Sequence, residues 1–117
     1  MNKTNTFEKI INGSTTTSKI IYKDKDVTAF YDIHPIAPIH ILIVSNKLIK
    51  SINDIDKKNK YILGHMLYVA VILAKKVKIN NSGYRLIINC NEHGGQEIFH
   101  LHVHLLGGKN LGKMLCK

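Results

Sequence analysis

Residues 99–106 alternate between apolar side chains and histidines, and this alternation restricts the fold more than any other feature of the chain. Successive side chains of a β-strand point to opposite faces of a sheet. The three imidazoles of His100, His102 and His104 would therefore project together, about 6.6 Å apart along the backbone. The opposite face would carry Phe99, Leu101, Val103 and Leu105. The segment predicts a strand with one histidine face and one core face.

A long amphipathic helix is predicted between an N-cap at Asn53 or Asp54 and the sequence NNSG at residues 80–83. Its core face repeats at 3.6-residue spacing through Ile62, Met66, Val69, Ala70, Leu73 and Val77. A second apolar stripe beside it contains Leu63, Leu67 and Val71. One sheet cannot cover both stripes, so either the helix is deeply buried or the second stripe contacts a partner copy. The pattern alone does not decide between them.

The remaining segments predict one mixed domain, 1–117, without repeats. A short helix is predicted at residues 7–11, and further strands at 19–22, 27–31, 39–44 and 84–90. The sequence KDKD between the first two strands predicts a hairpin turn. The sequence HPIAP before the third predicts another turn, because proline is poorly suited to a central strand.

The net charge of +9 raises the question of nucleic-acid binding. The basic residues are sixteen lysines and Arg85, scattered along the whole chain, so forked guanidinium groups for base reading are nearly absent. We therefore expect a solvated basic surface and no nucleic-acid partner.

Location is predicted from cysteine content and hydropathy. Cys90 and Cys116 fit neither a disulfide framework nor a zinc-cluster spacing, which favours a reducing cytoplasm. The first six residues lack the apolar segment of a secretory signal. The apolar run at 61–74 is too short to span a bilayer. We expect a cytoplasmic protein without a membrane partner.

Three interpretations of the histidine strand remain open. Three structural histidines would each need a buried hydrogen-bond partner. A metal site would use the H-x-H pair as ligands, with Glu97 or Cys90 as a further ligand. In a catalytic site, a neutral imidazole would act as a nucleophile while protonated neighbours stabilise phosphate oxygens.

The catalytic interpretation requires a fixed tautomer. If Nδ1–H of His102 donates to a backbone carbonyl, the Nε2 lone pair faces the substrate. Gly94 and Gly95, which lack Cβ atoms, would allow backbone N–H groups to approach an anion. His40 would join the cluster if its predicted strand is adjacent.

The sequence NEHGGQEIFHLHVHLLGG at residues 91–108, preceded by Asn89, resembles the histidine triad (HIT) superfamily, specifically its Hint branch of purine nucleoside phosphoramidases. The segments FEKII (7–11), TAFYDI (28–33), APIHILIV (37–44) and GYRL (83–86) extend the resemblance over nearly the whole chain. It implies an α+β fold in which a five-stranded antiparallel sheet carries one long and one short helix. It also implies a homodimer with a ten-stranded sheet.

By this resemblance, His102 is the nucleophile that attacks the α-phosphorus of an adenosine 5′-phosphoramidate, such as AMP-NH₂, AMP-lysine or lysyl adenylate. An AMP-histidine intermediate then releases AMP, with no metal or cofactor. The family roles place His104 and His40 at the phosphate, and give the carbonyl of His100 the task of orienting the nucleophile. The implied substrate contacts are Asn89, Gly95 and Gln96 at the phosphate and leaving group, Asp32 at the ribose, and Ile10, Phe30, Tyr31 and Ile33 around the base.

Two departures bear on the leaving group. Glu97 stands where many Hint proteins have serine, and would favour a cationic leaving group. Residues 107–117 replace the family's frequent Trp-Pro-Pro-Gly ending; the GGKNLGK they contain is no P-loop, because Met114 stands where Ser or Thr would hold Mg²⁺. The alternatives are a nucleotide-binding regulatory module with incidental hydrolysis and a dinucleoside polyphosphate hydrolase; a basic RNA-binding protein ranks behind them.

Overall fold

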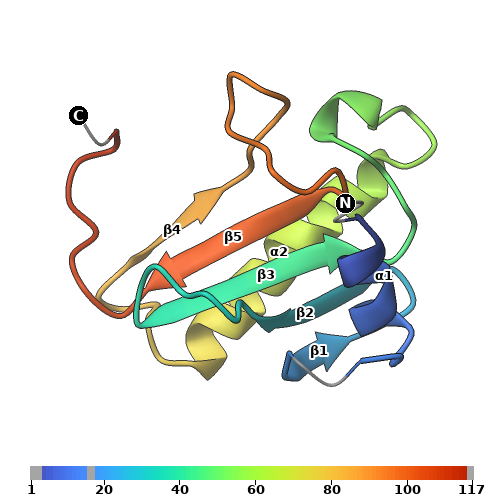
Figure 1. The fold of residues 1–117 in the computed structure, drawn as a ribbon. Coiled ribbons are helices and arrows are strands. Elements are labelled where there is room, and N and C mark those ends of the chain that lie inside the picture. Colours follow the sequence, from blue (N-terminus) through green and yellow to red (C-terminus); the bar gives the residue numbers. More distant parts are fainter. Residues whose placement is uncertain (1–3, 16–17, 116–117) are drawn as a thin grey trace.

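The computed structural model describes residues 4–15 and 18–115, which form one sheet and its covering helices (Figure 1). Cys116 lies outside the described residues. The helical elements are α1 (Thr4–Ile11), the 3₁₀ turn η1 (Ile52–Asp54) and α2 (Lys60–Lys76). The strands are β1 (Ile20–Lys23), β2 (Val27–Tyr31), β3 (Ile39–Ser45), β4 (Tyr84–Ile87) and β5 (His102–Gly107).

The five strands form one antiparallel sheet in the order β1-β2-β3-β5-β4. The predicted hairpin joins β1 to β2. The predicted fold class, an antiparallel five-stranded sheet with one long and one short helix, is confirmed. β3 and β5 lie side by side at the centre, so His40 is brought next to the histidine strand.

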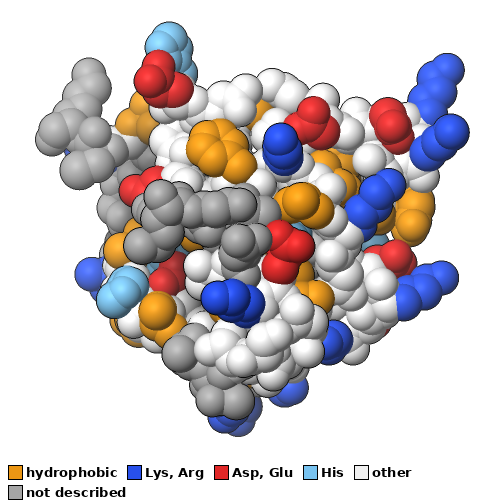
Figure 2. Space-filling view, turned by 45° about the vertical axis from the view of Figure 1, so that its right-hand side comes forward, with side chains coloured by type: hydrophobic (Ala, Val, Ile, Leu, Met, Phe, Trp, Pro, Cys, Tyr) orange, Lys and Arg blue, Asp and Glu red, His pale blue; other side chains and the backbone are white. Residues whose placement is uncertain are grey.

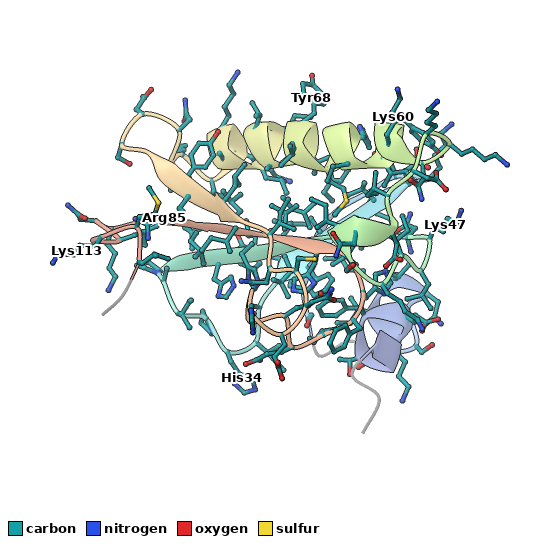
Figure 3. All side chains as sticks on the ribbon, turned by 90° about the horizontal axis from the view of Figure 1, so that it is seen from above. His34, Lys47, Lys60, Tyr68, Arg85 and Lys113 are labelled. Atoms are coloured by element: carbon teal, nitrogen blue, oxygen red, sulfur yellow. The ribbon has the colours of Figure 1, made fainter. Side chains whose placement is uncertain are left out.

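α2 covers one face of the sheet, as Figure 3 shows from above. Ile41 and Ile43 of β3 and Val103 and Leu105 of β5 point to this side and are fully buried. The helix contributes Ile62, Met66, Val69, Ala70, Leu73 and Ala74. Five of the six predicted core positions are thus buried; Val77, the C-cap residue, is partly buried. This packed layer supplies most of the apolar burial that stabilises the fold.

The second helical stripe faces outward. Leu67 and Val71 are each 37% exposed, and Leu63 is half-buried. Deep burial of the whole helix, one of the two alternatives above, is therefore wrong.

α1 covers part of the other face. Phe7 and Ile10 of this helix pack against Phe30, Leu42 and Val44, forming a smaller core. Antiparallel partners share a face, and the register pairs Leu42 with His104 and Val44 with His102. The histidines and the smaller core therefore lie on the same side of the sheet.

Three predicted element boundaries are wrong. The strand predicted at residues 84–90 ends at Ile87. β5 begins at His102, and Phe99, predicted to be in the core, lies in a bend with 46% of its surface exposed. The predicted helix N-cap residues belong instead to η1, where Ser51 and Asp54 form a capping box. α2 starts only at Lys60, because the chain makes this separate turn first.

A partly buried hydrogen-bond network links the β1–β2 hairpin to α2. Asp24 accepts hydrogen bonds from the Tyr22 hydroxyl and from Nε2 of His65, each at 2.6 Å, and from the backbone N–H groups of Asp26 and Val27. These donors hold the pKa of Asp24 well below its usual range, although burial opposes them.

Among the described residues, no helix has both the length and the apolar character needed to cross a bilayer.

Candidate active site

A cavity of about 650 Å³ opens on the sheet face opposite α2. Its walls come from α1, the β2–β3 connection, the central strands and the loop between β4 and β5. The described residues lining it are Thr6, Phe7, Ile10, Ser18, Phe30, Asp32, Ile33, His34, Ile36, His40, Leu42, Asn89, Gly95, Glu97, Ile98, His102 and His104. In Figure 3 this region lies below the sheet, on the side of the labelled His34.

His102 lies at the start of β5 with its ring orientation fixed. Its Nδ1 is 2.6 Å from the carbonyl oxygen of His100. A carbonyl can only accept, so Nδ1 carries the proton, and in the neutral ring Nε2 carries the lone pair. The ring of Phe7 meets the imidazole edge-on at a centroid distance of 5.2 Å. This is the tautomer that nucleophilic catalysis requires.

His40 and His104 take complementary tautomers. The backbone N–H of Ile36 donates to Nδ1 of His40, so the His40 proton is on Nε2. Nε2 of His40 is 3.0 Å from Nδ1 of His104, which therefore accepts. The neutral His104 ring then carries its proton on Nε2. The cavity thus combines a lone pair on His102 with an N–H donor on His104.

Burial keeps these rings neutral. Desolvation, with contributions from His102 and His40, lowers the pKa of His104 to about 4. Desolvation also lowers the pKa of His102 and, against the nearby carboxylate of Asp32, that of His40. In the free protein the neighbouring rings are therefore neutral N–H donors, and the expected protonation of these rings beside a phosphate stays a prediction.

His100 lies behind the cavity and does not line it. Its ring is fully buried, and Nε2 donates to the carbonyl of Ser45 at 2.6 Å. Within the described chain, Nδ1 of His100 has no hydrogen-bond partner. Desolvation lowers the pKa of this ring as well. The ring anchors the backbone whose carbonyl holds His102.

The loop after β4 brings backbone and side-chain groups to one wall. Asn89 donates from Nδ2 to the carbonyl of Gly94 at 2.6 Å. A Cβ at Gly94 would overlap the backbone of Cys90, and Gly95 has a φ of 76°, so glycine is needed at both positions. At the other wall, Oδ1 of Asp32 accepts from the N–H of His34 at 2.8 Å, and Oδ2 lies 3.5 Å from Nε2 of His40.

Ten of the thirteen predicted site residues line the cavity: His40, His102, His104, Asp32, Ile33, Phe30, Ile10, Asn89, Gly95 and Glu97. Two expected substrate contacts, Tyr31 and Gln96, do not line the cavity, and their roles stay predictions. Tyr31 packs against the core under α2. Gln96 is buried and braces the loop through the carbonyls of Lys50 and Ile98. His100, predicted to act through its carbonyl, does place that carbonyl against His102.

Sequence reasoning missed several lining residues, chiefly Phe7, His34 and Ile36. The amphipathic pattern of residues 7–11 could have identified Phe7, because Phe7 and Ile10 share a helix face. His34 and Ile36 lie in a turn whose path the sequence does not define.

The described residues form no metal centre, and a second cavity lacks the histidines and carboxylates that line the first. Within residues 4–15 and 18–115, no three His, Cys, Asp or Glu side chains are arranged to hold a metal ion. A second cavity, of about 610 Å³, lies between residues 78–85 and 108–112. No His, Asp or Glu of the described chain lines it.

The lowered histidine pKa values predict an acid-sensitive fold. Such a histidine binds a proton more readily in the unfolded chain than in the folded protein. A falling pH therefore favours the unfolded chain, and the stability of the fold decreases. For His104 the window runs from about pH 6.5, the usual value of the unfolded chain, to about 4. We expect the urea midpoint to decrease between pH 7.5 and 4.5. The dependence should be shallower in His104→Asn; an unchanged slope in that variant would contradict the assignment.

The chain was compared with known proteins. A HIT domain model matches residues 14–111. An uncharacterized HIT-like protein of Buchnera aphidicola (subsp. Baizongia pistaciae) is 66% identical over 110 residues, covering 94% of this chain and 97% of that protein. The purine nucleoside phosphoramidase of Escherichia coli K12 is 52% identical over 99 residues, covering 85% of this chain and 83% of that protein.

Solved structures show the same fold. A histidine triad protein from Clostridium difficile has a TM-score of 0.90 at 40% identity, covering 98% of this chain and all of that chain. A HIT family hydrolase from Clostridium thermocellum has a TM-score of 0.90 at 42% identity, covering 94% and 96%. The family model, which matches most of the chain, and these relatives show that the chain belongs to the HIT domain family.

Proposed function

We propose that this protein is a purine nucleoside phosphoramidase that hydrolyses adenosine 5′-phosphoramidates to AMP and an amine. The observation that carries the proposal is the tautomer of His102, whose lone pair on Nε2 belongs to a ring lining the cavity. The relative from E. coli, named a purine nucleoside phosphoramidase, supports the substrate class. The HIT family hydrolase among the solved structures supports hydrolysis.

The proposed reaction has two steps. Nε2 of His102 attacks the α-phosphorus, and the P–N bond to the amine breaks with its electron pair passing to the amine nitrogen, which takes up a proton from solvent. Water then attacks the phosphorus and gives a proton back to solvent, the P–Nε2 bond breaks with its electron pair returning to Nε2, and AMP is released with the ring restored. Nε2–H of His104 donates to a phosphate oxygen, supplying stabilisation without a metal ion.

The remaining contacts follow from the cavity walls. Asp32 accepts hydrogen bonds from the ribose hydroxyls in this proposal, which is supported by its position in the cavity wall beside His40. Ile10, Phe30 and Ile33 form the apolar slot for the base. Such a slot distinguishes one purine from another only weakly.

The direct test is a hydrolysis assay with adenosine 5′-phosphoramidate in EDTA-treated buffer. We expect stoichiometric AMP and amine, and mass spectrometry of the acid-sensitive adduct should locate AMP on His102 after rapid quenching. Binding of AMP without turnover would favour a nucleotide-binding regulatory module instead. Turnover that requires added zinc would contradict the proposed mechanism.

We also propose that a second copy of the chain covers the outer face of α2. Tyr61, Leu67, Tyr68 and Val71 of this face are 37–60% exposed, and Figure 3 shows Tyr68 pointing away from the sheet. β4 beside it is an edge strand, with one side unpaired within the described sheet. An apolar helix face next to an open strand edge is suited to a homodimer with a continuous sheet.

The predicted homodimer is tested with a charge on the helix face. We expect Val71→Glu to shift the protein from dimer to monomer in sedimentation velocity at micromolar concentration, because the carboxylate would be buried against an apolar partner surface. Lys57→Glu, an exposed change outside this face, should leave the dimer intact. A monomeric wild-type protein at these concentrations would refute the proposal.

A further inference from the structure

The charge of the cavity is opposite to that of the chain. The protein has a net charge of +9, and the face shown in Figure 2 carries basic side chains together with acidic ones. None of the described residues lining the cavity is Lys or Arg, whereas two, Asp32 and Glu97, carry carboxylates. Four histidines line the cavity, and three of them, His40, His102 and His104, have lowered pKa values and add no positive charge at neutral pH.

The carboxylates of Asp32 and Glu97 differ in their contacts with other residues. Both oxygens of Asp32 have protein neighbours, the N–H of His34 and Nε2 of His40. Glu97 is exposed on the loop that also brings Asn89 and Gly95 to the cavity. Within the described chain, its carboxylate has no hydrogen bond or ion pair with another residue. Glu97 is therefore the carboxylate whose oxygens remain available to a ligand.

The position of Glu97 along the chain indicates which part of a substrate it meets. Asp32 follows β2 and lies beside His40, whereas Glu97 lies on the loop that leads into β5 at His102. With the nucleoside at the Asp32 wall, the group leaving from phosphorus at His102 departs toward the other wall. The carboxylate of Glu97 then acts on the charge of the leaving group.

We propose that Glu97 is a specificity-determining residue, favouring adenosine phosphoramidates whose amine carries an additional positive charge and disfavouring leaving groups with a negative charge, including polyphosphates. This inference rests on the proposed function. A single exposed carboxylate, screened by water and salt, changes relative rates by about 2- to 5-fold per unit charge. The effect requires no new bond-making step, only attraction or repulsion of the departing group.

The experiment uses three substrates that differ in one terminal charge. They are the adenosine 5′-phosphoramidates of 1,4-diaminobutane, n-butylamine and 4-aminobutyrate, whose leaving amines carry a cationic, an uncharged and an anionic far end. We expect wild-type kcat/KM to fall in that order by about 2- to 5-fold per step at low salt. In Glu97→Gln the ratios should approach 1, and in Glu97→Lys the order should reverse.

The matched control is Glu92→Gln, which removes an exposed carboxylate from the same loop at a position that does not line the cavity. It should keep the wild-type ratios. Turnover of the butylamine substrate by each variant shows that the site is folded. Unchanged ratios in Glu97→Gln, or an equal loss for all three substrates, would overturn the role of Glu97 while leaving the proposed function in place. Failure of the wild-type protein to hydrolyse any of the three would instead overturn the proposed function.

Discussion

His102→Ala should lose turnover of adenosine 5′-phosphoramidate by about 10⁴-fold or more in kcat/KM, because the two-step route has no nucleophile without Nε2. The same variant should yield no AMP adduct when the reaction is quenched and examined by mass spectrometry. Affinity for AMP should change much less, since the apolar slot and Asp32 lie on other elements.

The control for this variant is His93→Ala. His93 is an exposed histidine on the loop before β5 and does not line the cavity, so its removal should leave turnover within about 2-fold. Circular dichroism and the urea midpoint test whether His102→Ala remains folded. Turnover near the wild-type rate in a folded His102→Ala protein would contradict a covalent route through this ring.

The alternation of residues 99–106 was sufficient to predict the central feature of the site. It separated His102 and His104 from Val103 and Leu105, and the structure places these pairs on opposite faces of the sheet. The prediction worked because a two-residue period leaves a strand no other way to bury its aliphatic side chains. Placing His40 beside them needed the order of the strands, which the alternation does not give; the family resemblance implied only that His40 lies at the phosphate, and the structure pairs β3 with β5.

Other features depend on contacts between distant parts of the chain. Phe99 has strand propensity, yet its segment bends before β5 as His100 bonds to the carbonyl of Ser45. The protonation of His104 could not be predicted from an ordinary histidine pKa, since burial beneath its neighbours sets it. Tyr31 and Ile33 are two positions apart, so strand alternation would place them on one face; Tyr31 ends β2 and packs against the core under α2, whereas Ile33 lies in the β2–β3 connection and lines the cavity.

Leu105→Ala should lower the free energy of unfolding by about 2–5 kcal/mol, the usual cost of removing a buried leucine side chain. Leu105 is fully buried and pairs in register with Ile41 and Leu86 beneath α2. For a chain of this length the thermal midpoint should decrease by about 8–20 °C. Urea titration and a thermal scan at one fixed protein concentration measure both quantities, because a dimer's midpoint depends on concentration.

This variant also tests whether the two faces of β5 act separately. Leu105 directly follows His104, but its side chain lies on the α2 side of the sheet, away from the cavity. Below the transition, turnover should therefore stay within a few-fold of wild type, the reverse of the result at His102. Leu48→Ala, at a half-exposed position, should change stability by less than about 0.5 kcal/mol. A folded Leu105→Ala protein that lost activity as completely as His102→Ala would mean that the core under α2 sets the geometry of the histidines, and the two faces could not be treated as independent.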